Sequence, residues 1–420
     1  MDQPTGEGNV MLRILVAVVT IFLISSETSA RQVTIATWNL GWHMDIATAQ
    51  RWIEACGKTY VEDAGIGRWV PSTDSNATQG WDVPNTFDIE NWDTAVLPVC
   101  DAYAYRGVVR VNVDAYRKRQ EQIANFISRS VPADIIAFQE VSGEQAVKEV
   151  LPGAGADYDL CGFSGYKVQR LVIAWKKSLG TKVSCEVEDS LSLPANPDSK
   201  RPRPGLSLTL SLGGAIVRIL DVHLKSSCVS PFDGGKLEGN GNNCMILQQQ
   251  IDPIESWVER ETSDGAKVVM LGDFNRNLWH ELRDQSPVRT DGSAASGIRP
   301  SGVLSRSLIE EVFDGQPFTT DLRLVNEHCQ TNEVGAVLCT LSEIRDLDTA
   351  ESDLLASQNY LGCRNPVGLD HILIGPGIEA TAPAEHTSIR RLGMTRQKDD
   401  GTDQVLAISD HCPLVVRLNL

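Results

Sequence analysis

The stretch "ADIIAFQEV" (133–141) decides the fold class. A short apolar run with β-branched residues is typical of a strand that is buried on both faces, as in a sheet covered by helices. This run ends in Glu140. Because a buried carboxylate is costly without a partner, we expect Glu140 to emerge at the edge of the sheet.

Segments on both sides of this stretch alternate between strand and helix patterns. Apolar runs and alternating patterns predict strands at 32–40, 165–177, 205–212, 215–226, 267–275, 369–375 and 411–420. Helical spacing of apolar residues predicts helices at 115–130 and 245–261, the second with Pro253 as its start or a kink. The sequence therefore predicts an α/β fold.

Long polar stretches separate these elements at 57–113, 226–243 and 276–366. Loops of this length are uncommon unless they are functional or held by cross-links. We interpret them as insertions in one core domain, residues 31–420, that frame the substrate groove; partial disorder is the alternative. The basic residues Arg117, Lys118 and Arg119 are expected on the solvated surface, with a phosphate-facing role as the alternative.

The N-terminal 30 residues have the features of a signal peptide. Arg13 precedes an apolar run at 14–24, and the small residues "TSA" precede Arg31. The run is too short for a comfortable membrane span. We predict cleavage and no stable membrane association afterwards; an uncleaved anchor is the alternative. Met11 is a candidate for the true start, since the first ten residues do not fit such a signal.

Cysteine content and charge narrow the class further. Ten cysteines without a CxxC pair indicate disulfides in an oxidising compartment, so we expect a secreted or periplasmic protein. Connectivity cannot be read from spacing, and Cys228 with Cys244 is only one candidate pair. The formal net charge of −17 argues against tight nonspecific nucleic-acid binding. It does not exclude a nucleic-acid enzyme, because divalent cations screen charge locally.

Polar residues recur where the predicted strands end. Their side chains would meet at one site if the strand tips converge. Carboxylate and amide oxygens favour Mg²⁺ or Ca²⁺ as ligands, and imidazoles suit proton transfer. The residues at the tips are Asn39, Glu140, Asp221, His223, Asp273, Asn275, Asp370, His371, Asp410 and His411.

The fragments that carry these residues resemble, in order, the endonuclease/exonuclease/phosphatase superfamily, the DNase I-like group of metal-dependent phosphoesterases. The resemblance implies a four-layered α/β sandwich, with two mixed β-sheets packed face to face and helices outside. It also implies Mg²⁺ as the cofactor, with Mn²⁺ or Ca²⁺ as alternatives. The fragments are "WNL" (38–40), "DIIAFQEV" (134–141), "DVHLKS" (221–226), "LGDFNRN" (271–277), "LDHIL" (369–373) and "SDHCPL" (409–414).

The resemblance assigns the metal to one group of residues. Glu140 would be the principal ligand, Asn39 would bind the metal or position the carboxylates, and Asp410 would complete the acidic cluster. A capping role is the alternative for Asn39. Some relatives carry an acid at the position of Gly41, so a second metal site of that kind is not expected here.

The resemblance also assigns catalytic roles. His223 would contact the scissile phosphate, Asp273 would orient or deprotonate the attacking water, and Asn275 would hold a phosphate oxygen. Asp370 would orient His411, which would act as general base or phosphate-binding group.

Three further residues near these motifs have competing interpretations. Arg170 is a candidate for substrate phosphate, although its register is ambiguous by one position. His371 is interpreted as a satisfied strand residue, and Lys225 as either surface charge or part of a basic strip.

Three functions remain open. The first is a secreted or periplasmic endonuclease on DNA, with RNA as a second substrate, aided by a basic strip formed by residues 117–119, Lys225, Arg276 and "KRPRPG" (200–205). The second is a phosphodiesterase or phosphatase on lipids or small phosphoesters, of the sphingomyelinase or inositol-phosphate type. The third is a non-catalytic binding protein. Trp69, Trp81 and Trp92 would form an apolar hairpin for lipid, stack bases or pack a small core. No protein partner is predicted.

Overall fold

The computed structural model describes Met1 and residues 31–103, 108–228, 242–276, 278, 308–312, 321–325, 330–331, 337–338, 369–387 and 406–420. The chain divides into two units, Met1–Arg31 and Gln32–Leu420. The signal peptide expected at the N-terminus falls almost wholly outside the described residues.

No helix in the described part of the chain has the length and apolar character needed to cross a membrane.

The first sheet has seven strands in the order β16-β18-β1-β5-β7-β6, and β17 pairs with β18. Strands β1 and β5 run parallel, whereas β18, β7 and β6 join antiparallel to their neighbours. The strands are β1 Gln32–His43, β5 Ile135–Val141, β6 Tyr158–Gly162, β7 Arg170–Lys176, β16 Glu379–Ala380, β17 Glu385–His386 and β18 Leu414–Asn419.

The second sheet has six strands in the order β12-β15-β11-β10-β9-β8. Its parallel pair is β10 with β11, and the other pairings are antiparallel. The strands are β8 Thr181–Glu188, β9 Gly205–Leu212, β10 Ala215–His223, β11 Lys267–Asp273, β12 Arg323–Leu324 and β15 Asp370–Ile374.

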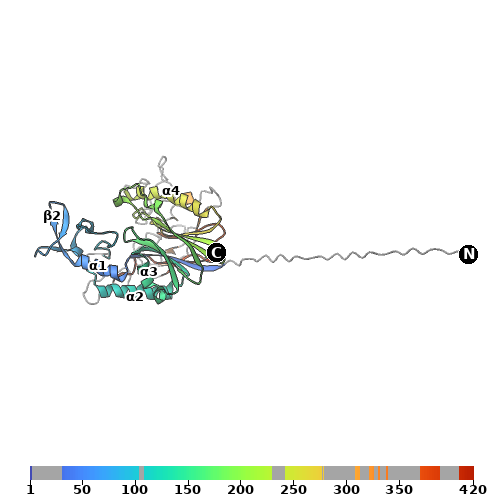
Figure 1. Ribbon diagram of the computed structural model, residues 1–420, viewed down its shortest axis with the longest axis horizontal. Coiled ribbons are helices and arrows are strands. Elements are labelled where there is room, and N and C mark those ends of the chain that lie inside the picture. The colour runs from blue at the N-terminus through green and yellow to red at the C-terminus, as the bar shows by residue number, and fades with distance from the viewer. Residues whose placement is uncertain are drawn as a thin grey trace. The chain divides into compact units, whose positions relative to one another are not determined.

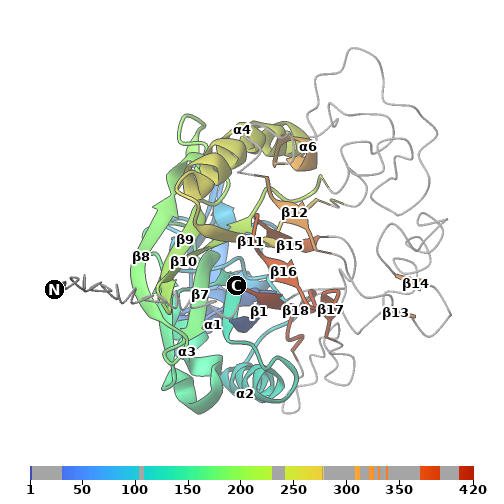
Figure 2. The same cartoon turned by 90° about the vertical axis from the view of Figure 1, so that its right-hand side faces the viewer.

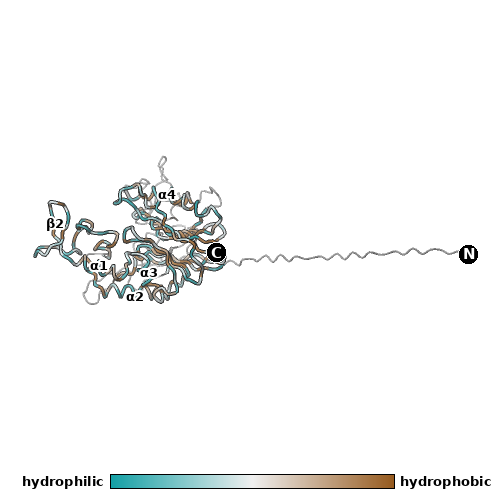
Figure 3. Tube along the Cα trace, in the orientation of Figure 1, coloured by the Kyte–Doolittle hydropathy of each residue, from teal (hydrophilic) through white to brown (hydrophobic). Residues whose placement is uncertain are grey.

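The two sheets pack face to face, with helices on their outer faces (Figures 1 and 2). One apolar cluster joins strands of both sheets, for example Ile35 and Ile173 with Leu208 and Ile219. A second cluster lies between the first sheet and α2, and a third between the second sheet and α4. The predicted four-layered α/β sandwich is therefore confirmed, and Figure 3 shows the hydrophobic stretches concentrated in its strands. The helices are α1 Ile46–Gly57, α2 Val113–Ser130, α3 Glu144–Val150, α4 Asn242–Thr262 and α6 Leu308–Val312.

The stretch 57–113, expected to be irregular, folds in part as a three-stranded sheet in the order β3-β2-β4. Trp81 is buried, and Trp69 and Trp92 pack against buried neighbours. Of the other insertions, 229–241 and most of 279–368 lie outside the described residues. The smaller elements are β2 Thr59–Asp63, β3 Arg68–Pro71, β4 Thr78–Gln79, β13 Gln330–Thr331, β14 Val337–Leu338, and the 3₁₀ turns Gly80–Asp82, Thr86–Asp88, Pro152–Gly155, Asp189–Ser192 and Asp198–Lys200.

Disulfides cross-link both the core strands and the insertions. The bonds are Cys56–Cys100, Cys161–Cys185 and Cys228–Cys244, the last being the pair considered from the sequence. Cys412 is also disulfide-bonded and is almost fully buried. It therefore takes no part as a thiol in the chemistry of its neighbour His411.

Strand register places the polar tips together. Asn39 on β1 pairs with Gln139 on β5, next to Glu140. On the second sheet, His223 pairs with Asp273, and Asp273 pairs with Asp370. The buried amide of Gln139 donates a 2.7 Å hydrogen bond across the sandwich to Asp221. The carboxyl ends of both parallel pairs therefore meet at one end of the sandwich, as the sequence predicted.

A buried arginine connects the backbone segments at this end of the sandwich. Arg119 on α2 is 1% exposed, so its expected place on the solvated surface is wrong. Its guanidinium donates to the carbonyls of Leu40 at 2.7 Å and Ala407 at 2.6 Å, and also to Ile408. The end of β1 is thus tied to the segment that precedes Asp410 and His411.

We expect Arg119→Met to lower the free energy of unfolding by about 3 kcal/mol, because several buried carbonyls lose their donor. Arg117→Met on the same helix is the control, since the described part of the chain gives Arg117 only an exposed ion pair with Asp114. Urea denaturation measures both. Equal effects of the two substitutions would contradict the role given to Arg119.

Candidate active site

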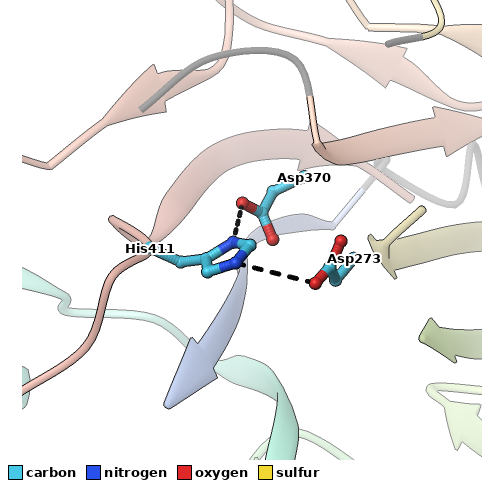
Figure 4. A group of neighbouring side chains, drawn as sticks. All are labelled: Asp273, Asp370 and His411. Atoms are coloured by element: carbon cyan, nitrogen blue, oxygen red, sulfur yellow. Dashed lines mark hydrogen bonds and ion pairs between the residues drawn. The ribbon is translucent and has the colours of Figure 1, made fainter. Parts of the chain in front are cut away.

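An imidazole lies between two buried carboxylates at the end of the sandwich (Figure 4). His411 Nδ1 donates a 2.7 Å hydrogen bond to Asp370 Oδ2. On the other side, His411 Nε2 lies 3.7 Å from Asp273 Oδ2. His411 precedes β18 of the first sheet, whereas the two aspartates belong to the second, so this contact spans both sheets. The predicted pairing of Asp370 with His411 is present.

The carboxylates favour the charged form of this imidazole. Burial alone would lower the pKa of His411, but Asp370 and Asp273 outweigh it and raise the pKa well above the ordinary value. Asp370 fixes the orientation of the ring by accepting from Nδ1, which leaves Nε2 directed toward Asp273. His411 is therefore a cation that can donate a hydrogen bond or a proton from Nε2.

Asp273 is held from two directions. The amide of Asn39 donates a 2.9 Å hydrogen bond to Asp273 Oδ2, and the backbone N–H of Asn275 donates one of 2.8 Å to Oδ1. Burial raises the pKa of Asp273 to about 7, with nearby Asp370 adding to the rise and His411 opposing it. A carboxyl in this condition is poised to exchange protons near neutral pH.

The second histidine has the opposite character. His223 Nε2 lies 3.6 Å from Glu140 Oε1 and 3.5 Å from Asp273 Oδ2. Burial lowers the pKa of His223 well below its usual value, and Arg203, His411 and Lys225 lower it further. The site therefore combines a charged imidazole with a neutral one.

Glu140 stands at the open side of the site. Its side chain keeps 16% of its surface exposed, against 2% for His223 and Asp273. Its backbone is left-handed, with φ of 56°, at an irregularity in the pairing of β5. Such a conformation costs a non-glycine residue about 1–3 kcal/mol and is typical of functional sites. The Trp42 N–H donates a 3.2 Å hydrogen bond to Oε2 and fixes the carboxylate.

Asn275 and Asp410 also lie at this end of the sandwich. The Asn275 amide donates a 3.1 Å hydrogen bond to the carbonyl of Leu224, which leaves its side-chain oxygen for other partners. Asp410 lies beside Gly41, where a Cβ would come within 3.4 Å of its carboxylate. Gly41 has φ of 54°, so the missing side chain makes room for Asp410 and permits the turn.

Arg170 does not match its expected role. Its guanidinium donates to the backbone carbonyls of Ala95 at 2.6 Å and Tyr166 at 3.0 Å, and also to Ser142. These bonds occupy both terminal nitrogens and give Arg170 a structural role. His371 is a fully buried strand residue whose Nε2 lies 3.0 Å from the Arg276 carbonyl, which agrees with the structural role expected for it.

Arg203, and not Arg170, places a guanidinium beside the site. The sequence did not single out Arg203 for this role. Its guanidinium lies 3.9 Å from Glu140 Oε1. It also donates to the Gln169 side chain and, at 3.2 Å, to the Gln169 carbonyl. The only signal in the sequence was the basic "KRPRPG" segment, which has no periodic pattern that would place it at the strand tips.

The charges and donor atoms of the site fit a hard divalent cation. Asp273, Asp370 and His411 have ligand atoms within 4.8 Å of one another. Asp370 Oδ1 is buried and has no hydrogen-bond partner among the described residues. With Glu140 and Asp410 included, four carboxylates face the two cations His411 and Arg203, so a divalent cation would balance the charge.

The sequence at 107–411 matches the Endonuclease/Exonuclease/phosphatase family. This match covers more than half of the chain, and the chain belongs to this family. No curated protein matched the sequence.

Several solved structures are similar to this chain at low sequence identity. Humanized D. rerio TDP2 is 12% identical, with a TM-score of 0.41, over 93% of this chain and 99% of that one. A Bacteroides thetaiotaomicron mannosyl-6-phosphatase is 12% identical, with a TM-score of 0.42, over 92% and 100% of the chains. The human nocturnin catalytic domain is 12% identical, with a TM-score of 0.38, over 72% and 86%.

We expect Asp370→Asn to lower kcat for a generic phosphodiester, bis(p-nitrophenyl) phosphate, by about 10³-fold, because the amide no longer supports the charged imidazole or fixes its orientation. The matched control is Asp264→Asn, which removes an exposed partner of Arg218 near the start of β10. Steady-state kinetics with thermal melting distinguishes lost chemistry from lost folding. A kcat equal to that of the control would rule out this role for Asp370.

Proposed function

We propose that the chain is a secreted or periplasmic, divalent-metal-dependent phosphodiesterase that acts as an endonuclease on DNA, with RNA as a second substrate. The observation that carries the proposal is the His411 imidazole, held by Asp370 and directed at Asp273, beside Glu140 and His223. Buried acid–base groups beside an exposed carboxylate suit hydrolysis of a phosphodiester by water.

Each residue of the site has a separate role in the proposed hydrolysis. Asp273 accepts the proton of the attacking water, since Asn39 and Asn275 fix its orientation. The charged His411 and the neutral His223 donate hydrogen bonds to phosphate oxygens as negative charge develops there. Asn275 holds a further phosphate oxygen. In-line attack of water then forms one P–O bond and breaks the bond to the leaving oxygen, which takes up a proton.

The metal is assigned to the side of the site that belongs to the first sheet. Glu140 would be its principal ligand, with Asn39 and Asp410 beside it. Mg²⁺ would polarise the phosphoryl oxygen and offset its charge, and Mn²⁺ or Ca²⁺ are the alternatives. The exposed edge of Glu140 supports this assignment, because water and phosphate can reach it, whereas Asp273 and Asp370 are buried.

Packing of the tryptophans favours nucleic acid over lipid. A lipid enzyme of this class would need an exposed apolar hairpin near the site, and Trp69, Trp81 and Trp92 were its candidates. Instead Trp69 and Trp92 pack with Tyr60 and Val83, and Trp81 packs edge-on against Trp52 of α1. Basic side chains, including Lys225, line the groove beside the site.

The disulfides support the proposed compartment. Bonds such as Cys56–Cys100 and Cys161–Cys185 persist in oxidising surroundings and are rare in the cytosol. The signal-peptide pattern at 1–30 agrees with export. A mature N-terminus near Arg31 on the exported protein, read by peptide sequencing, would support this part of the proposal; full-length protein in the cytosol would refute it.

A substrate panel tests the activity. With Mg²⁺ we expect nicking of supercoiled plasmid and cleavage of RNA, and little release of phosphate from p-nitrophenyl phosphate or phosphocholine from sphingomyelin vesicles. His411→Ala should lower plasmid cleavage by about 10³-fold or more while the protein still melts cooperatively. Lys182→Ala, an exposed change on β8, is the control. Cleavage of lipid or monoester with intact plasmid would overturn the nuclease assignment.

Glu140→Gln tests the metal assignment without an activity readout. The substitution keeps the size of the side chain but removes its charge, so we expect the affinity for Mg²⁺ or Mn²⁺ to fall about tenfold or more. Calorimetric titration of the purified variant measures this, with the exposed Glu144→Gln as the control. Unchanged affinity would place the metal elsewhere.

A further inference from the structure

A groove of about 390 Å³ lies beside the candidate site. Segments 166–169, 200–203 and 225–226 form it together with the start of α4. No carboxylate lines it among the described residues, although the chain carries a formal charge of −17. Its cations are Lys167, Lys200, Arg201, Arg203 and Lys225.

Two of these cations keep their charge unpaired within the groove. Lys167 Nζ lies 3.5 Å from the Arg201 carbonyl, and Lys225 Nζ lies 3.1 Å from the Ser226 carbonyl. The described residues give neither lysine a carboxylate within ion-pair distance. Arg201 differs, since it pairs at 3.6 Å with Asp198.

The cations repel one another. Burial lowers the pKa of Lys225, and the charges of Arg203 and Lys167 lower it further. The pKa of Lys167 falls through burial and through Arg203 and Arg201, with Asp198 opposing in part. A bound anion would relieve this repulsion, whereas water screens it only in part because both lysines are half-buried.

Hydrogen bonds connect the segments that form the groove, and the groove adjoins the active site. Tyr166 donates a 2.9 Å hydrogen bond from its hydroxyl to the Arg201 carbonyl, which ties two of the segments together. The backbone N–H of Lys225 donates to Gln250 of α4 at 2.9 Å. Arg203 belongs to the groove and also lies 3.9 Å from Glu140, so groove and active centre share a wall.

We propose that this groove binds a second phosphate of the substrate, next to the phosphate that is hydrolysed. The preferred substrate must then carry at least two phosphates. In a nucleic-acid strand the second is the neighbouring phosphodiester; in a small molecule it is a distal phosphate. This inference rests on the proposed phosphodiesterase activity and names the feature of the substrate that the site selects.

Lys167→Ala/Lys225→Ala tests the proposal in the full-length protein. For a single-stranded 12-mer DNA we expect KM to rise tenfold or more with a smaller change in kcat. For bis(p-nitrophenyl) phosphate, which has one phosphate, KM should change much less. Lys182→Ala is the control, because it also removes one lysine charge. Lys182 lies near the start of β8, at the end of the sheet opposite the strand tips that form the site. Equal KM changes for the two substrates would overturn the proposal.

A binding measurement without hydrolysis tests the groove independently of the proposed activity. Anisotropy of the labelled 12-mer, measured in EDTA at several salt concentrations, gives the slope of log affinity against log salt. The slope should become shallower by about 0.7 or more in the double variant, since each lost phosphate contact removes about that amount for single strands. An unchanged slope would refute the groove, while absent hydrolysis of every phosphodiester would refute only the activity.

The two sources of a second phosphate are distinguished by competition. The 12-mer and thymidine 3′,5′-bisphosphate compete against the labelled strand. Displacement by the strand at far lower concentration identifies a neighbouring phosphodiester as the source, and equal potency identifies a small bisphosphate. Both outcomes support a phosphate subsite if the Lys167→Ala/Lys225→Ala protein binds the better competitor at least tenfold more weakly. If the affinity of neither competitor changes in the double variant, the proposed subsite is overturned.

Discussion

The hydrogen bond between His411 and Asp370 joins the two sheets at the point where the chemistry would occur. His411 precedes β18 of the first sheet, and Asp370 begins β15 of the second, so the pair exists only while the sheets keep their relative position. Two further polar links span the same gap, from Asn39 to Asp273 and from Gln139 to Asp221. Buried polar groups are costly unless they are paired, and these pairings hold only in one alignment of the strands. The apolar layer between the sheets supplies the driving force for packing, and the polar links define its register at the site.

Charge in the site is arranged in opposite ways for the two histidines. His411 has carboxylates on both sides and stays charged, whereas His223 is buried near Arg203 and Lys225 and stays neutral. The basic groove thus acts on the catalytic centre as well as beside it, because its cations help to keep His223 neutral. One imidazole can offer a full charge and the other a neutral hydrogen bond to the same phosphate. Such environments for chemically identical side chains arise from folding, because distant segments supply the neighbouring charges.

Local pattern predicts the strands, the helices and the polar strand tips, whereas the four-layered sandwich was implied by the resemblance to the family. Apolar runs that end in Glu140 or Asp273 mark buried strands and their exits, and parallel pairing then brings the tips together. Local pattern says nothing about the environment of a residue in an irregular segment. Arg119 reads as one of three basic surface residues, yet long-range packing buries it against backbone carbonyls. Arg203 follows no period, and the left-handed backbone at Glu140 is imposed by the tertiary pairing of β5. The small sheet of 57–113 was also missed, since its strands are short and rich in polar residues.

The central claim is that His411 acts as the charged partner of Asp370 while the divalent cation binds at Glu140. Two arrangements compete for it, because Asp273, Asp370 and His411 also lie close enough to share one ion. Anomalous scattering from crystals grown with Mn²⁺ distinguishes them directly. We expect a peak in contact with the Glu140 carboxylate, with the bond from His411 Nδ1 to Asp370 still formed. A peak bound by His411 and both aspartates, with that bond broken, would contradict it.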